Sequence, residues 1–306
     1  MFQRSTAAIP LLLLAACGGT PAPTQPNAPP PVFQVPTGVS VLVASMYQQL
    51  PSYIAGALAD SQADLPRNQH IASFINAKIA LLQRPTLAVE IADGRMFAER
   101  TATSIDERRI EIATLFAEER MRGEAMQTIQ VVGEALPILE RFLDTRFPAS
   151  SVRVWYGFKV GHSGGGATIS SEDRTSYEAR TPASRLPHDS ILGHELAHSY
   201  IGNEILNQFL ELYVYNRLHG SGPDLSTWSF TRGYTGPSDA NRDVALVLDV
   251  YQMLGHDAMA RAYKAAYGLR PPYGQPLSAA VRQAFVEQAP QQFKATVDAK
   301  LSLITF

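Results

Sequence analysis

Hydrophobic positions along this chain recur mostly at spacings of three and four, the periodicity of an amphipathic helix. The segment 125–147 shows it with Ile129, Val132, Leu136 and Leu139. Pro137 interrupts that segment and predicts a kink or a break in the helix. The same spacing predicts further helices at residues 204–218, 238–254, 256–267 and 277–306. The chain is therefore expected to be mostly helical.

A few shorter stretches have the composition or alternation of β-strands. Residues 152–156 are β-branched and aromatic, and residues 164–170 form a glycine-led run ending in a second strand. Residues 86–92 alternate at period two before Asp93-Gly94, which predicts a hairpin with residues 96–100. Residues 104–107 resemble a capping box, which predicts a helix running through Ile112 and Phe116.

The segment His194-Glu195-Leu196-Ala197-His198 carries the candidate chemistry. Residues four apart lie on one face of a helix, so both imidazoles can reach one cation, with Glu195 beside it as a general base. This spacing is the H-E-x-x-H zinc signature of metal-dependent hydrolases. The alternative is a core helix whose two histidines are satisfied by hydrogen bonds, and it is disfavoured because burying them costs desolvation.

The order of these elements predicts an α+β fold that is mostly helical. A small sheet is expected to pack on the H-E-x-x-H helix, and a helical C-terminal part follows, as in zincin-like folds. We expect four segments: a signal peptide at 1–16, a lipidated N-terminus and Pro-rich linker at 17–38, a helical N-terminal region at 39–124, and a metallopeptidase domain at 125–306.

The N-terminus has the pattern of an export signal. A short positive start is followed by an apolar run too short to span a bilayer. Leu14-Ala15-Ala16-Cys17 resembles a bacterial lipobox, in which Cys17 is lipidated and anchors the chain to a membrane. Because Gly18 follows rather than Asp, the expected place is the outer membrane of the cell envelope, facing the periplasm. Ordinary secretion with nearby cleavage is the alternative.

Composition limits the remaining partners. Cys17 is the only cysteine in 306 residues, so no disulfide is expected within the chain. The net charge is −2, and no basic cluster with interleaved aromatic residues is present in the sequence, which makes nucleic acid an unexpected partner.

The run His194 to Asn203 reads H-E-L-A-H-S-Y-I-G-N. It resembles the metal helix of the membrane alanyl aminopeptidase family of gluzincins, in which the pattern is H-E-L-A-H-S-W-x-G-N. The resemblance extends over about 125–289. It implies a zincin-like fold, a Zn²⁺ ion held by His194 and His198, Glu195 as general base, and a peptide or protein substrate.

Three features depart from the family pattern, and the first is the third zinc ligand. The family places a glutamate on the next helix, in a pattern like L-N-E-G-F-A-x-Y-V. Here Gln208 aligns with that position, and Gln offers only a neutral oxygen. Glu211 is the expected replacement, with Glu204 as second choice, and Glu211 as an ordinary solvated helix residue remains the alternative.

The second and third departures concern the substrate. The family's glycine-led strand carries a Glu that binds the substrate's free amine, whereas Gly165, Gly166 and Ala167 carry no carboxylate. These three residues are expected to bind the substrate backbone by strand addition, and an endopeptidase fits better than an aminopeptidase. The family's oxyanion-stabilising Tyr has no direct match, which leaves Tyr234 or Asn241 as candidates.

His162 and His188 flank the motif in sequence and are interpreted as surface or outer residues. The predicted function is that of a lipid-anchored zinc metallopeptidase. One alternative is a degenerate gluzincin-like scaffold that acts as a cell-envelope binding module. Another is a zinc hydrolase of a different amide, such as one of the cell wall.

Overall fold

The computed structural model describes residues 32–181, 188, 190–220, 238–267, 269 and 277–305. Its longer helices are α1 (Val41–Asp64), α2 (Ala72–Leu82), α3 (Leu87–Asp93), α4 (Arg122–Leu143), α5 (Arg174–Arg180), α6 (Ser190–Ala197), α7 (Glu204–Leu218), α8 (Ser238–Leu254), α9 (His256–Tyr267), α10 (Ala279–Gln288) and α11 (Lys294–Ser302). The strands are β1 (Phe97–Thr103), β2 (Arg109–Phe116), β3 (Ser151–Tyr156), β4 (Ser163–Gly164) and β5 (Thr168–Ser171). The expected class, mostly helical with a small sheet, is confirmed.

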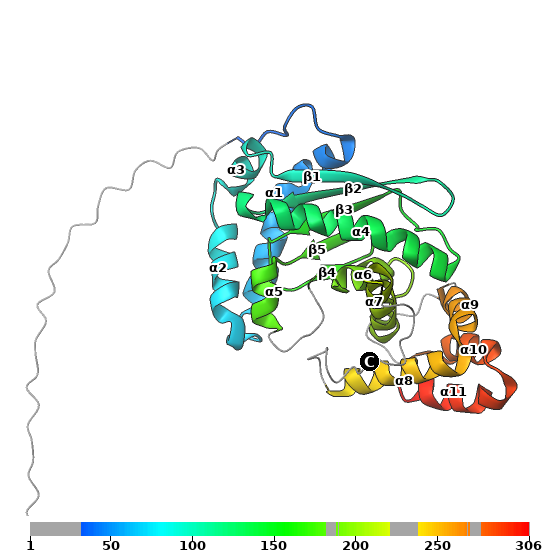
Figure 1. Cartoon of the computed structure of the whole chain (residues 1–306). Coiled ribbons are helices and arrows are strands. Elements are labelled where there is room, and N and C mark those ends of the chain that lie inside the picture. Colours follow the sequence, from blue (N-terminus) through cyan, green and yellow to red (C-terminus); the bar gives the residue numbers. More distant parts are fainter. Residues whose placement is uncertain are drawn as a thin grey trace, which may run out of the picture. The chain divides into compact units, whose positions relative to one another are not determined.

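The strands form one mixed sheet in the order β1-β2-β3-β5-β4 (Figure 1). β2, β3 and β5 run parallel, while β1 and β4 are antiparallel to their neighbours. The very short β4 therefore lies at one edge of the sheet. α4 crosses one face of the sheet, and α1 lies on the other (Figure 1).

Both faces of the central strands are buried, which explains their nearly continuous apolar sequences. Ile112, Val154 and Ile169 belong to a core shared with α4, α6, α7 and the C-terminal helices. Leu115 and Trp155 belong to a second core on the α1 side of the sheet. Alternate residues of one strand thus enter different cores, as strand geometry requires.

The predicted strand at 86–92 is wrong, because this segment forms the helix α3. Leu87 and Ile91 are four residues apart and both buried, so a helical turn places them on one face. Gly94 is the end of that helix rather than a hairpin turn, and its N–H donates to Glu90 O. β1 follows, but it pairs with β2 and not with the preceding segment.

The predicted capping box at 104–107 is also wrong. These residues form the turn between β1 and β2, where the Ser104 N–H donates to Arg108 O at 2.9 Å and Glu107 adopts a positive φ of 66°. Ile112 and Phe116 lie in β2 rather than in a helix. Pairing with β1 and β3, which is remote in sequence, outweighs the local helix signal.

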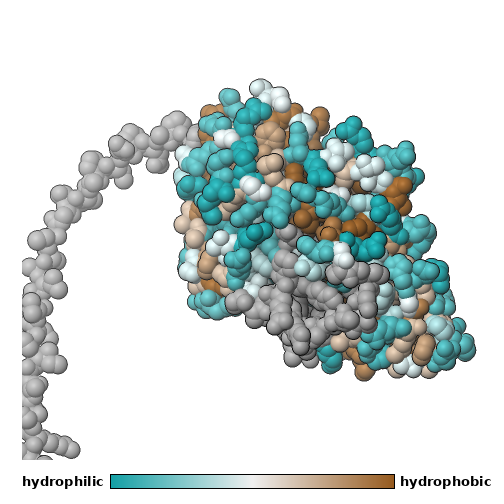
Figure 2. Space-filling model, viewed as in Figure 1, coloured by the Kyte–Doolittle hydropathy of each residue, from teal (hydrophilic) through white to brown (hydrophobic). Residues whose placement is uncertain are grey.

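The predicted helix around 125–147 is confirmed as α4, which continues through Pro137. The helices predicted at 204–218, 238–254 and 256–267 match α7, α8 and α9. On the face drawn in Figure 2, apolar residues are interspersed among hydrophilic ones. Among the described helices, none has the length and apolar character needed to cross a membrane.

Candidate metal centre

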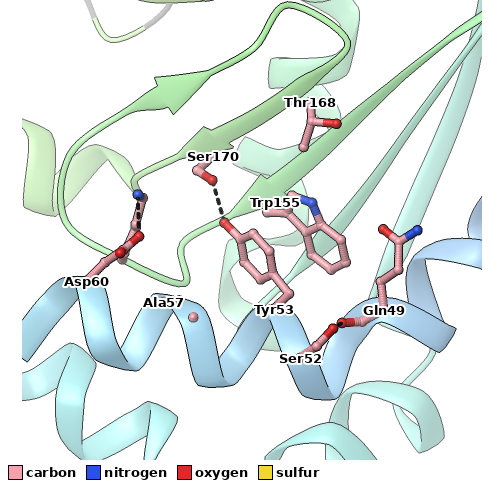
Figure 3. Close-up of a pocket in the computed structure, with 10 residues that line it drawn as sticks. Gln49, Ser52, Tyr53, Ala57, Asp60, Trp155, Thr168 and Ser170 are labelled. Atoms are coloured by element: carbon pink, nitrogen blue, oxygen red, sulfur yellow. Dashed lines mark hydrogen bonds and ion pairs between the residues drawn. The ribbon is translucent and has the colours of Figure 1, made fainter.

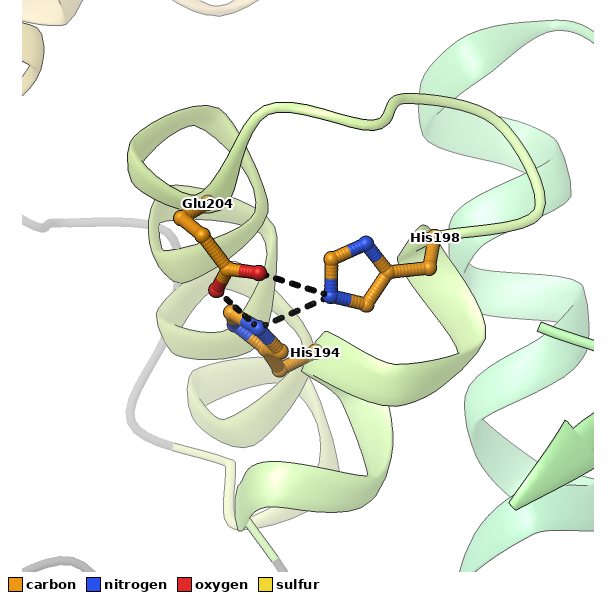
Figure 4. A group of neighbouring side chains, drawn as sticks. All are labelled: His194, His198 and Glu204. Carbon is orange, nitrogen blue, oxygen red and sulfur yellow. Dashed lines mark hydrogen bonds and ion pairs between the residues drawn. The ribbon is translucent and has the colours of Figure 1, made fainter. Parts of the chain in front are cut away.

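The two histidines of the motif converge at the C-terminal end of α6. The apolar residues Leu192, Leu196 and Ala197 bury this helix in the core. His194 lies in the helix, and His198 follows its last residue, with the His198 N–H still donating to His194 O at 3.3 Å. One helical turn therefore separates the rings, and their Nε2 atoms lie 3.2 Å apart (Figure 4).

Glu204 completes the group from the first residue of α7. Asn203 caps this helix by accepting the Leu206 N–H at 3.0 Å, which fixes the start of the helix beside α6. The Glu204 Oε2 atom lies 3.0 Å from His194 Nε2, and Oε1 lies 3.4 Å from His198 Nε2. One ligand atom from each of the three side chains fits within a 4.8 Å span, as Figure 4 shows.

Glu211 lies on the opposite edge of the His194 ring. Its Oε2 atom is 3.5 Å from His194 Nδ1, while Oε1 accepts from Ser190 Oγ at 3.0 Å. The structure thus brings Glu204, rather than Glu211, to the point where the two Nε2 atoms meet. Glu211 was the expected ligand and Glu204 the second choice, and spacing along α7 alone could not decide between them, since it does not show which turn of the helix faces the gap between the rings.

Asn207 contacts the Nδ1 atom of His198, just as Glu211 contacts the Nδ1 atom of His194. Its side-chain amide lies 2.8 Å from His198 Nδ1, and Nδ2 also donates to Ile201 O at 2.7 Å. Sequence reasoning gave Asn207 no role. The signal that could have revealed it is a polar stripe at 204, 207, 208 and 211 on one face of an otherwise apolar helix.

Glu195 points from α6 toward the sheet edge. Its residue is 5% exposed, and the backbone of Gly164 in β4 lies directly against its carboxyl group: a Cβ at residue 164 would meet Glu195 Oε2 at 2.5 Å. Burial raises the pKa of Glu195 to about 7, and the nearby charges of Glu204 and Glu211 contribute to the increase. This is the range suited to a group that exchanges protons at neutral pH.

The electrostatics of the group favour a bound cation. Burial and the His194 charge together lower the pKa of His198 to about 4. Burial also opposes protonation of His194, but contacts with Glu204 and Glu211 outweigh it and leave the His194 pKa raised. Burial raises the pKa of Glu211 as well. Several carboxyl groups and two imidazoles are buried close to one another, and a divalent cation would balance the charge of the carboxylates.

The donor set also fits zinc in kind and in spacing. Zinc in proteins is bound by His nitrogen and carboxylate oxygen with tetrahedral geometry. Bonds of about 2.0–2.1 Å in that geometry separate two ligand atoms by about 3.3 Å. The two Nε2 atoms are 3.2 Å apart; one oxygen of Glu204 lies 3.0 Å from the His194 Nε2 atom, and the other oxygen lies 3.4 Å from the His198 Nε2 atom.

The residues expected to bind substrate lie in the tight turn between β4 and β5. The Gly165 N–H donates to Thr168 O, and the Ala167 N–H donates to Gly165 O. Ala167 O accepts from the Arg153 N–H at 2.9 Å. Gly166 has a φ of 77° and packs against Ser199, just beyond the motif. These hydrogen bonds join backbone groups of the turn to one another, to β5 and to β3, while Gly164 of β4 is the residue that contacts Glu195.

His162 and His188 are buried, so the surface interpretation is wrong for both. His162 Nδ1 lies 3.2 Å from Glu172 Oε1, and its Nε2 lies 3.2 Å from Ser171 Oγ. His188 Nε2 lies 2.8 Å from the carbonyl of Glu172. This buried cluster connects the residue before β4 with the segment before α6. Tyr234 and Cys17, and the side chain of Asn241, lie outside the described residues.

No known protein-family model matches the chain, and no curated protein is similar in sequence. Among solved structures, an M1 zinc metallopeptidase from Deinococcus radiodurans is 13% identical over 69% of this chain and 52% of its own, with a TM-score of 0.47. Aminopeptidase A of Legionella pneumophila, solved in complex with aspartic acid, is 12% identical over 68% of this chain and 28% of its own, with a TM-score of 0.49. The chain thus spans about half of the first protein and less of the second. Neither TM-score reaches 0.5, so the function of this chain has to be inferred from its own side chains.

Proposed function

We propose that this protein is a zinc-dependent hydrolase of peptide bonds, with His194, His198 and Glu204 as the zinc ligands. The observation that carries the proposal is that three potential ligand side chains converge, with the carboxyl group of Glu195 next to the first of them in sequence. The two Nε2 atoms lie 3.2 Å apart, each has an oxygen of the Glu204 carboxylate within 3.4 Å, and Glu195 follows His194 directly.

Glu204 is preferred over the other two candidates on α7. Glu211 faces Nδ1 of His194, the nitrogen that keeps its proton when Nε2 binds a metal. A carboxylate at Nδ1 orients the ring and makes it a stronger ligand without binding the metal. Gln208 offers no anionic oxygen. We therefore assign Glu211 and Asn207 as the residues that orient His194 and His198.

Glu195 is the proposed general base and later the general acid. When bound, zinc polarises a carbonyl and makes water acidic enough to act as a nucleophile at neutral pH. The Glu195 carboxylate accepts a proton from the attacking water and delivers a proton to the leaving amine. A pKa of about 7 suits both transfers. Gly164 leaves room for the carboxyl group to hold its position at the sheet edge.

The proposed arrangement is zincin-like, with the sheet edge beside the metal helix. α6 contacts both β4 and β5, and β4 is the last strand of the sheet. An extended peptide lying along β4 would pass Glu195, which supports binding by strand addition. Because the turn from Gly165 to Ala167 carries no carboxylate, an endopeptidase is preferred over an aminopeptidase. Tyr234 or Asn241 is the proposed donor to the oxyanion.

The proposed location is the bacterial cell envelope. It is supported by the sequence alone, through the lipobox-like Leu14-Ala15-Ala16-Cys17 and the Pro-rich linker that follows. Lipidation at Cys17 would anchor the chain to a membrane. The proposed membrane is the outer membrane, with the protein facing the periplasm. A binding module without catalysis is less favoured, because Glu204 supplies the anionic ligand that Gln208 cannot.

Zinc content of the purified chain tests the proposal. We expect one zinc per chain in the wild type, and loss of stoichiometric zinc in Glu204→Ala. Gln208→Ala, on the same helix face, is the matched control and should keep its zinc. A peptide library should then be cleaved by the zinc-loaded wild type. Wild-type protein that takes up no zinc from a zinc-containing buffer would refute the hydrolase.

A further inference from the structure

A pocket lies on the face of the sheet opposite α4, away from His194, His198 and Glu204. It has a volume of about 480 Å³ and lies between α1 and the strands β3 and β5, beside the point where Tyr53 Oη is 2.6 Å from Ser170 Oγ (Figure 3). One wall follows a single face of α1 from Gln49 to Asp60. The other wall contains Trp155, Thr168 and Ser170. This volume is within the range of small-molecule binding sites in proteins.

Gly56 keeps the pocket open from the helix side. It lies in the interior of α1 and lines the pocket, and a Cβ at this residue would meet no atom within 4 Å. Close packing therefore does not require glycine there. Glycine inside a helix costs roughly 1 kcal/mol relative to alanine. Glycine at residue 56 therefore leaves the space beside this turn of α1 unfilled.

Trp155 supplies an unused hydrogen-bond donor in the pocket wall. The residue is 2% exposed, and its indole nitrogen is not among the buried side-chain atoms of the described residues that lack a partner, so the N–H has access to the space of the pocket. A donor that opens into a pocket can be satisfied by water or by a ligand that fills the space. Figure 3 shows the indole nitrogen on the ring edge that faces Thr168, whose hydroxyl also lines the pocket.

The charges and rings in the pocket restrict the chemistry of its ligand. Lys159 and Asp60 form an ion pair at 3.2 Å, so neither an anion nor a cation meets a net opposite charge. Tyr53 covers one face of the Trp155 ring, with ring centroids 4.0 Å apart, so a flat aromatic ligand finds no open stacking face there. A purely apolar ligand would leave the indole N–H unsatisfied.

We propose that this pocket binds a neutral saccharide. Hydroxyl groups act both as donors and as acceptors, which matches the indole N–H, the Thr168 hydroxyl, the Gln49 amide and the exposed Asp60 carboxylate. A peptide strand is a poorer match, because β3 and β5 are each paired with strands on both sides and offer no free edge to it. The site is independent of the zinc ligands and of the proposed hydrolysis.

Calorimetry and the indole N–H signals in NMR spectra of the full chain test the proposal. The probes are tri-N-acetylchitotriose, cellotriose and maltotriose, with a capped trialanine peptide for comparison. The chain has two tryptophans, so the spectrum of Trp155→Phe assigns the Trp155 signal. We expect at least one saccharide to shift that signal and to bind with a Kd of about 1 mM or tighter, at about −4 kcal/mol.

The variants separate the pocket from the rest of the surface. Gly56→Leu fills the space from the helix side and should weaken saccharide binding at least tenfold. Gly123→Leu is the matched control, because Gly123 lies in α4 and also has no atom within 4 Å of a Cβ; it should bind like the wild type. Saccharides that leave the Trp155 signal unmoved at about 10 mM, binding unaffected by Gly56→Leu, or a shift caused by the peptide alone would each overturn the proposal.

Discussion

The backbone of Gly164 lies against the carboxyl group of Glu195, so closely that a Cβ at residue 164 would come within 2.5 Å of Glu195 Oε2. Residue 164 is in the edge strand β4, and Glu195 is in α6. The sheet edge therefore sets the position of the proposed general base. Any side chain at residue 164 has to push the carboxyl group away, because the Glu195 terminus is the flexible partner in this contact.

Gly164→Ala is expected to lower peptide hydrolysis on the order of 10²-fold, because a displacement of about 1 Å at a reacting group has this effect. Zinc content should stay at the wild-type value. Gly123→Ala is the control, since Gly123 lies in α4, outside the proposed site, and a Cβ there meets no atom within 4 Å. Rates are measured on the same peptide for all three proteins. Equal rates for Gly164→Ala and Gly123→Ala would contradict the proposed contact.

Glu195→Gln tests the base itself. The amide keeps the size of the side chain but cannot accept the proton, so hydrolysis should fall on the order of 10²–10⁴-fold. Zinc should remain bound, because Glu195 is not among the three side chains whose ligand atoms converge. Zinc content and turnover are measured on the same preparation. A variant with wild-type turnover would rule out Glu195 as the base.

Glu211 and Asn207, which contact the Nδ1 atoms of the two histidines, should strengthen zinc binding without being required for it. Glu211→Gln and Asn207→Leu are each expected to weaken zinc binding about 10–100-fold, the usual effect of losing a partner that orients a ligand. Competition against a zinc chelator measures the affinity. Complete loss of zinc in Glu211→Gln, with zinc retained in Glu204→Ala, would instead restore Glu211 as the third ligand.

The sequence was most informative where local spacing decides the structure. His194 and His198 are one helical turn apart, which places both rings on one face, and their Nε2 atoms lie 3.2 Å apart. The helix α7 was also predictable to its end residues, because its apolar pattern and its Asn203 cap are local signals. The choice between Glu204 and Glu211 was not, since it depends on how α7 is rotated against α6.

The errors at 86–92 and 104–116 have the same origin. Leu87, Val89 and Ile91 satisfy period two, but Leu87 and Ile91 also satisfy a spacing of four, and packing against α1 selected the helix. Ile112 and Phe116 fit a helical spacing, yet β2 pairs on one side with β1 and on the other with β3. The second partner is remote in sequence, so no short window contains it.

The contact between Gly166 and Ser199 gives a prediction about stability. Gly166 has a φ of 77°, and a Cβ there would come within 2.6 Å of the Ser199 Cα atom. Gly166→Ala combines backbone strain with a clash against backbone and should destabilise the fold by more than about 2 kcal/mol. Gly161→Ala is the control: its φ is 90°, but nothing lies within 4 Å of its Cβ. It should cost only the strain, about 1 kcal/mol.

Urea unfolding measures both free energies. The difference between the two alanine variants isolates the contact between the β4–β5 turn and the end of the metal helix. Two variants of equal stability would mean that the turn can move away from Ser199 at no cost, and the turn would then not fix the position of α6.

The buried pair of His162 and Glu172 predicts acid sensitivity. Burial lowers the pKa of His162 from 6.5 to about 4, although the Glu172 carboxyl partly opposes this. Burial alone would raise the pKa of Glu172, but its contacts with His162 and Arg180 outweigh burial and lower it from 4.5 to about 2. As the pH falls below 6.5, His162 becomes protonated in the unfolded chain, whereas in the folded chain it becomes protonated only near pH 4. As the pH falls below 4.5, Glu172 becomes protonated in the unfolded chain, whereas in the folded chain it becomes protonated only near pH 2.

Both groups therefore lower the free energy of unfolding as the pH falls. The loss from His162 develops between pH 6.5 and about 4 and amounts to on the order of 3 kcal/mol. Urea unfolding at several pH values across this window measures it, and His162→Gln supplies the comparison because the amide does not titrate. The wild type should lose stability more steeply than His162→Gln between pH 6.5 and 4. Parallel profiles would show that His162 takes up its proton equally in the folded and unfolded chain, and the buried cluster would then not be the origin of the acid sensitivity.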